Sequence, residues 1–193
     1  LLISPHGKSM LVSPFASHTI AYDPLTGARL WSVKHGGMNT GIRPLYGHGL
    51  LYIGTSDGQN PLIAFPPEGE GDITAKIAWR SNKQVPKRAS QLLIGDSLYM
   101  INDSGVASCL DAHTGETLWS NRLPGEYWAS PLYANGLIYG FSQKGEIPVF
   151  KASREFELVA ENKLDDGFVA SPAVAGNALI LRSKTHVYRI EKP

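Results

Sequence analysis

Short apolar runs separated by polar, glycine-bearing turns make up the whole chain, and no helical period of about 10–15 residues interrupts them. In the clearest stretch the runs predict four strands, at about residues 129–133, 137–141, 146–150 and 156–160. The link between the second and third of these, Ser142-Gln-Lys-Gly145, supplies the glycine that a tight hairpin needs for its positive φ. The pattern therefore predicts a four-stranded antiparallel unit.

Two segments of the chain are near-copies of each other. Residues 21–31 read AYDPLTGARLW, and residues 109–119 read CLDAHTGETLW. Each consists of an apolar run, a D-x-x-T-G turn and a second apolar run that ends in Trp. In such a turn the Asp side chain can accept backbone hydrogen bonds from two or three residues on, and the Gly can take the left-handed conformation.

The duplication belongs to a longer series with a period of about 40 residues. Aligned on the tryptophans, the marker positions are Trp31, Trp79, Trp119 and, by register, Val159, with spacings of 48, 40 and 40. Two further series move in step: Asp57-Gly58, Ser104-Gly105 and Lys144-Gly145; and Arg43-Pro44, Ser90-Gln91, Ser130-Pro131 and Ser171-Pro172. The extra residues of the second unit fall mostly in 66–76, which predicts a loop insertion. Self-similar all-β units of this length are typical of propeller blades.

The predicted fold is an all-β propeller of four-stranded antiparallel blades, about four to five of which are present. One propeller segment covers residues 1–193, in units at about 1–37 (partial), 38–85, 86–125, 126–166 and 167–193 (partial). The last unit lacks a predicted fourth strand, which in a closed ring is often supplied by the N-terminus. We therefore expect the segment to be the C-terminal half of a larger ring.

Composition excludes several classes of protein. The formal net charge of +1 gives no sign of the strongly basic surface that binds a polyanion, so nucleic acid is not an expected partner. No apolar run approaches the length of about 18 residues that a membrane span needs. The single cysteine, Cys109, takes the place of Ala21 in the repeat, which favours a buried small apolar side chain over a reactive thiol.

Residues 21–31 match the pattern A-x-D-x-x-T-G-x-x-x-W of the tryptophan-docking repeat, so the chain resembles the PQQ-like (quinoprotein-type) β-propeller family, in particular its BamB-like members. The resemblance implies that the Trp lies flat between neighbouring blades and stacks over the T-G turn. The structural repeat residues it marks are Asp23, Thr26, Gly27, Trp31, Trp79, Asp111, Thr114, Gly115 and Trp119. The second unit departs from the pattern with Pro66 in place of Asp, and the fourth keeps neither Trp nor T-G.

By this resemblance the chain is expected to be a non-catalytic scaffold that binds a protein, peptide or other ligand in the bacterial periplasm or another extracytoplasmic space. The alternative is part of a PQQ- and Ca²⁺-dependent quinoprotein dehydrogenase whose active-site residues lie mainly outside this segment. The family resemblance implies that such a site would have a vicinal disulfide on one side, a Trp on the other, and Glu, Asn and Asp as ligands of the metal. A single cysteine excludes the disulfide here, and no matching ligand cluster is evident, so no catalytic, cofactor or metal residue is assigned. A third possibility is an interaction domain fused to another module.

If the segment carries a binding surface, the residues that lead into the first strand of each unit are expected to line one mouth of the channel. The candidate binding rim consists of Arg43, Lys87, Arg88, Tyr127, Trp128 and Phe168, with Asn39 and Thr40 beside Arg43. The alternative for Tyr127, Trp128 and Phe168 is packing between adjacent blades. The acidic loop Glu68-Gly-Glu70-Gly-Asp72 could hold a hard cation, although a solvated insertion is the favoured interpretation.

Overall fold

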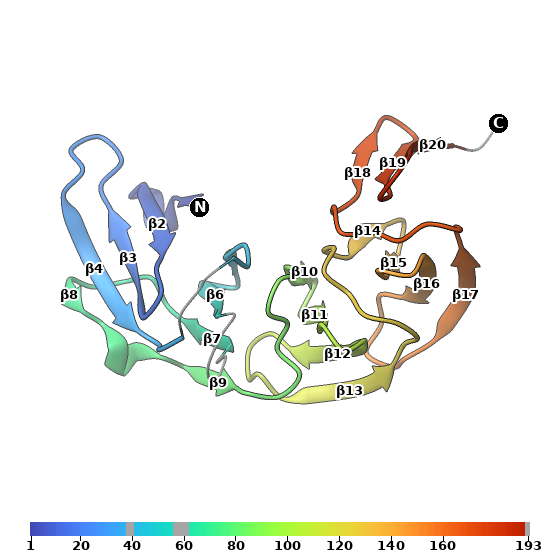
Figure 1. Ribbon diagram of the computed structural model, residues 1–193. Helices are drawn as coiled ribbons and strands as arrows, with labels where there is room; N and C mark the ends of the chain where they lie inside the picture. The colour runs from blue at the N-terminus through green and yellow to red at the C-terminus, as the bar shows by residue number, and fades with distance from the viewer. Residues whose placement is uncertain (38–40, 56–61, 192–193) are drawn as a thin grey trace. The chain divides into compact units, whose positions relative to one another are not determined.

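In the computed structural model, which describes residues 1–37, 41–55 and 62–191, nearly all regular structure is β-strand (Figure 1). Two short 3-10 helices, η1 (Pro5–Gly7) and η2 (Thr74–Lys76), are the exceptions within these residues. Among the described residues, no helix is long and apolar enough to cross a membrane. The prediction of an all-β fold is confirmed.

The strands of the described residues form five sheets, each built mainly from consecutive antiparallel strands. In order along each sheet they are β1 (Leu2–Ile3), β2 (Met10–Pro14), β3 (His18–Tyr22), β4 (Arg29–Lys34) and β8 (Gly71–Asp72); β5 (Leu45–Gly47), β6 (Leu50–Gly54), β7 (Leu62–Phe65) and β9 (Trp79–Ser81); β10 (Leu92–Ile94), β11 (Ser97–Ile101), β12 (Val106–Asp111) and β13 (Thr117–Arg122); β14 (Leu132–Ala134), β15 (Leu137–Tyr139), β16 (Glu146–Lys151) and β17 (Leu158–Lys163); and β18 (Ala173–Ala175), β19 (Ala178–Arg182) and β20 (Val187–Ile190). The last sheet has three strands, as the sequence predicts.

The chain divides into two compact units, one of residues 1–87 with 113–115 and the other of residues 88–112 with 116–193. The first two sheets belong to the first unit and the other three to the second. Each unit has its own buried apolar clusters. In the first, Val12, Ala21 and Val33 pack with Trp31 and Phe65.

The extra residues of the second repeat do not form a simple loop. They supply β8, which pairs in parallel with β4 and places Gly71 opposite Trp31 (Figure 1). The neighbouring Ile73 is 4% exposed, and its N–H donates to the Ser32 carbonyl at 2.9 Å. The insertion therefore covers the outer edge of the first sheet, an edge that would otherwise present unpaired backbone groups.

Two of the three carboxylates of this insertion, those of Glu68 and Asp72, take partners of their own. Asp72 accepts hydrogen bonds from Thr74 and pairs with Lys34 at 3.2 Å, and the Thr74 donors lower the pKa of Asp72 to about 2. Glu68 pairs with His6 at 2.9 Å. The geometry thus gives no support to a shared cation site in the loop 68–72.

The strand pairing corrects one position of the repeat. Trp31 lies opposite Ala21 and Trp119 opposite Cys109, each with a register shift that leaves a leucine bulged between paired residues. In the fourth sheet the same shift places Ala160 opposite Val149 and leaves Val159 in the bulge. The link before β17 is one residue longer than its counterpart before β13, so the position equivalent to Trp119 is Ala160 and not Val159.

Cys109 lies on β12, fully buried, in a cluster with Tyr99, Trp119 and Phe150. Burial disfavours the charged thiolate and raises the pKa of the Cys109 thiol. We expect the native chain to be inert toward a thiol reagent such as DTNB at pH 8, and to release one equivalent of chromophore once it is unfolded in guanidinium. Rapid reaction of the native chain would show that this part of the core is open.

Asp166, which precedes the first strand of the last sheet, is hydrogen-bonded to the turn between β19 and β20. One carboxylate oxygen accepts hydrogen bonds from Ser183 Oγ at 2.8 Å and from the N–H of Thr185 at 2.7 Å, and Thr185 Oγ1 also donates to it. These donors, above all the Thr185 hydroxyl, lower the pKa of Asp166 to about 2.

Because of this lowered pKa, the free energy of unfolding is expected to depend on pH in the acidic range. The folded value lies below the unfolded value of about 3.9, so the stabilisation is complete above about pH 4 and is lost as the pH falls through about 2. In urea unfolding between pH 5 and pH 2, the D166N variant is expected to lose less free energy of unfolding than the wild-type chain. Equal pH slopes for the two chains would contradict the assignment.

Candidate functional site

The first D-x-x-T-G turn is closed by its own aspartate. Asp23 Oδ1 accepts the N–H groups of Leu25 and Thr26, each at 2.9 Å, and these backbone donors lower the pKa of Asp23, with Thr26 as the largest cause. Gly27 has a φ of 71°, which a residue with a Cβ adopts only at a cost. The two turns share a backbone bond, since the Asp111 N–H donates to the Glu116 carbonyl at 2.9 Å and the Asp23 N–H to the Ala28 carbonyl at 2.8 Å.

Trp79 and the T-G turn of the next repeat are in direct contact within the first unit. A Cβ placed on Gly115 would lie 2.5 Å from Cε3 of the Trp79 ring, so the indole rests on the glycine backbone. Gly115 also has a positive φ of 73°. Both conditions require glycine at this position, because any side chain would push the indole away.

Trp119 packs on a turn that has lost the T-G pair. Its indole N–H donates to the Ser153 carbonyl at 3.1 Å, and Phe156 packs against its ring with centroids 5.1 Å apart. Arg154 Nη2 forms an ion pair with Asp111 Oδ2 at 3.0 Å. A backbone acceptor and an aromatic ring therefore contact Trp119 where another repeat has Thr-Gly.

The lead-in segments, which precede the first strand of each sheet, are joined in the second unit by a ladder of serines. The N–H of Ser90 donates to Ser130 Oγ at 2.9 Å, and the N–H of Ser130 donates to Ser171 Oγ at 3.0 Å. These serines occupy equivalent places 40 and 41 residues apart. The ladder fixes the backbone next to the candidate rim residues.

Arg88 and Trp128 form the strongest candidate surface of the second unit. The Arg88 guanidinium carbon lies 4.3 Å from the centre of the Trp128 ring, and Arg88 also forms an ion pair with Asp103. Trp128 is 38% exposed, an unusual state for so large an apolar side chain. Stacking over the ring and pairing with the carboxylate together hold the guanidinium in place.

Asp103 was not singled out by the sequence. It lies in the hairpin turn between β11 and β12, where Asn102 Oδ1 accepts the N–H groups of Ser104 and Val106. The matching position in the fourth repeat is Gln143, so no shared pattern marks the residue. Only the folded turn brings this carboxylate to Arg88.

The other predicted rim residues are placed differently. Tyr127 and Phe168 are at most 1% exposed, so their burial removes them from the rim and agrees with packing between blades. Tyr127 donates its hydroxyl to the Pro124 carbonyl at 2.7 Å, and burial raises its pKa. Arg43 and Lys87 are exposed residues of the first unit. Asn39, Thr40 and the Asp57-Gly58 landmark lie outside the described residues.

Comparisons with known proteins point in one direction. Residues 71–155 match the sequence model of a family described as outer membrane protein assembly factor BamB. A protein of that name from Alteromonas naphthalenivorans is 30% identical over 114 residues, covering 50% of this chain and 26% of the relative. The crystal structure of BamB from Moraxella catarrhalis superposes with a TM-score of 0.73 at 17% identity, over 98% of this chain and 56% of that one. The computationally designed Ika8 protein gives 0.71 at 12% identity, over 97% and 56%.

The aligned part therefore spans about a quarter of the curated relative (26%) and little more than half (56%) of each solved structure. The structural likeness bears on the fold, because both identities are low. The docking repeats, the antiparallel sheets and the family match nevertheless agree with one another. Together they support a β-propeller fold that is similar to that of the PQQ-like, BamB-like proteins.

Proposed function

We propose that the chain is a non-catalytic propeller scaffold that binds a protein partner in an extracytoplasmic space, through the surface formed by Arg88 and Trp128. The observation that carries this proposal is the half-exposed Trp128 ring with a guanidinium fixed on one face. The name of the relatives, outer membrane protein assembly factor, supports a role in protein assembly.

The chemistry of this surface suits a protein partner. Trp and Arg are the residue types most enriched among the side chains that dominate binding energy at protein interfaces. Asp103 and the Trp128 ring already hold Arg88 in one position, so little side-chain freedom remains to be lost when a partner binds. The ion pair itself contributes little stability, because half of the Arg88 side chain is exposed.

Site-specific photo-crosslinking tests the proposal. A benzophenone amino acid replaces Glu126, an exposed neighbour of Trp128, and the chain is produced in its bacterial host. We expect an adduct with an envelope protein-assembly component, identified by mass spectrometry, and its loss on adding Trp128→Ala or Arg88→Ala. The matched control carries the same probe at Tyr133, which is 42% exposed in the same unit. Equal adducts from both positions, or none from position 126, would count against the proposal.

The enzymatic alternative is tested on the full-length protein, because its active-site residues are expected mainly outside this segment. Titration with PQQ and Ca²⁺, followed by tryptophan fluorescence, is expected to give no saturable quenching. Stoichiometric quenching together with dye-linked oxidation of an alcohol or a sugar would replace the scaffold with a quinoprotein dehydrogenase.

A further inference from the structure

The docking tryptophans have different surroundings. Trp79 rests on Gly115, and Trp119 has both a backbone acceptor at Ser153 and a packed ring at Phe156. The indole N–H of Trp31 is buried and has no hydrogen-bond partner in the described chain. The reason lies in the second repeat, where Pro66 replaces the turn aspartate and the chain runs on to β8.

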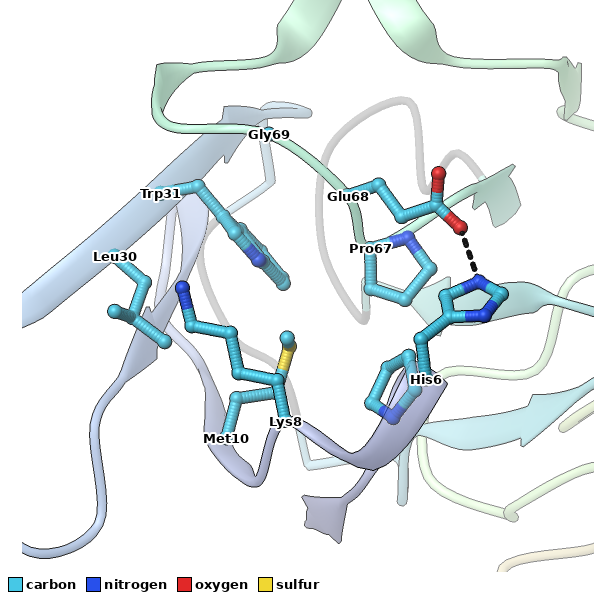
Figure 2. A pocket seen from close by; sticks show the side chains of 9 residues that line it. His6, Lys8, Met10, Leu30, Trp31, Pro67, Glu68 and Gly69 are labelled. Carbon is cyan, nitrogen blue, oxygen red and sulfur yellow. Dashed lines mark hydrogen bonds and ion pairs between the residues drawn. The ribbon is translucent and has the colours of Figure 1, made fainter.

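A cavity of about 180 Å³ lies beside Trp31, within the first unit (Figure 2). Its apolar walls include Trp31, Pro5, Met10 and Pro67. An apolar protein cavity of about 150 Å³ holds one benzene molecule, so the space beside Trp31 is sufficient for a single aromatic ring. Phe156 supplies such a ring to Trp119, so the chain itself shows which group suits this kind of tryptophan.

The polar lining of the cavity includes one ammonium group, that of Lys8. His6 and Glu68 satisfy each other at 2.9 Å, as the dashed line in Figure 2 shows. Lys8 also lines the cavity. Alongside the Thr26 N–H, its charge helps to lower the pKa of Asp23, but its ammonium group makes no hydrogen bond or ion pair with the described residues. An anionic group on an aromatic ligand would therefore be complementary to the pocket.

We propose that this pocket binds a small aromatic carboxylate. The ring lies between Trp31 and Pro67, and the carboxylate accepts a hydrogen bond from Lys8 Nζ. Cation and apolar walls act together, because neither an aromatic hydrocarbon nor a small inorganic anion would use both.

Phenylacetate is the probe for this site, with phenylacetamide as its neutral isostere. It is titrated into the ¹⁵N-labelled chain while the indole N–H signals are followed, and the Trp31→Phe variant assigns the Trp31 signal. We expect a saturable shift of the Trp31 signal with a Kd of about 1 mM, a usual strength for a ligand of about ten heavy atoms. Lys8→Met is expected to weaken binding about fivefold, as is the change to phenylacetamide.

Lys83→Met is the matched control, because Lys83 is an exposed lysine of the same unit that does not line the cavity. It is expected to bind phenylacetate as the unaltered chain does. The proposal is overturned by an unmoved Trp31 signal at about 20 mM phenylacetate, or by equal affinity for the amide. Equal losses in the two lysine variants overturn it too, as does a parallel shift of the Trp128 signal, which would report non-specific adsorption.

Discussion

Trp119→Ala is expected to lower the free energy of unfolding by about 3–5 kcal/mol, the usual cost of truncating a buried tryptophan. Trp119 is 9% exposed and packs against the rings of Phe150 and Phe156. Removing the indole leaves a cavity among these rings, and the Ser153 carbonyl loses its donor. Urea unfolding followed by circular dichroism measures the loss.

Trp128→Ala is the control for this experiment, because Trp128 is 38% exposed and lies outside the buried clusters of the second unit. Its cost is expected to be about 1 kcal/mol or less. If Trp119→Ala also costs less than about 1 kcal/mol, the indole does not hold the sheets together and the docking role is wrong.

Gly145→Ala is expected to destabilise the chain by about 3 kcal/mol or more. A Cβ on Gly145 would lie 2.0 Å from the Leu164 carbonyl oxygen, a distance that no backbone can tolerate without moving. Gly145 also has a φ of 91°, which adds the cost of a positive φ in a residue with a Cβ. The same glycine carbonyl accepts the Leu164 N–H at 3.0 Å, so the lead-in segment would be displaced with the hairpin.

Gly136→Ala separates these two causes. Gly136 has a φ of 79°, but nothing lies within 4 Å of a Cβ placed on it. Its substitution should therefore cost only the backbone penalty of about 1 kcal/mol. Equal destabilisation by the two alanines, measured by urea unfolding, would show that the close approach of residues 145 and 164 contributes nothing.

Much of the architecture is predictable because it depends on local rules. The turn Asp23–Gly27 forms as its composition predicts, since an aspartate that accepts nearby N–H groups and a glycine at positive φ act over five residues. The four-strand pattern is likewise local, because antiparallel neighbours follow one another along the chain. The short last sheet follows from the same pattern.

Three features were beyond the sequence because they depend on distant pairings. The strand β8 forms only because the edge of β4 accepts it, which no composition of residues 66–76 reveals. The shift from Val159 to Ala160 follows from one additional residue in a link that lacks the T-G marker. The sequence leaves two alternatives open for Tyr127 and Phe168, the rim or packing between blades, and only the tertiary packing shows that both are buried.

The candidate site was predictable only in part. Arg88 and Trp128 were chosen from their equivalent positions in successive repeats, and the structure brings their side chains together at 4.3 Å. Asp103, which holds Arg88, comes from a hairpin turn whose counterpart in the next repeat carries Gln143. Repeat alignment finds what the repeats share, and a binding surface depends on residues that differ between them.

The serine ladder of the second unit has a direction. Each serine passes its amide hydrogen forward to the hydroxyl of the next repeat, so Ser130 is an acceptor for Ser90 and a donor to Ser171. Loss of the Ser130 hydroxyl would leave the amide of Ser90 without its acceptor, while the amide of Ser130 would keep its own. Loss of a serine hydroxyl in one repeat therefore removes a hydrogen bond from the repeat before it. The effect of a substitution at 130 or 171 is thus expected at the amide 40 or 41 residues earlier, that of Ser90 or Ser130.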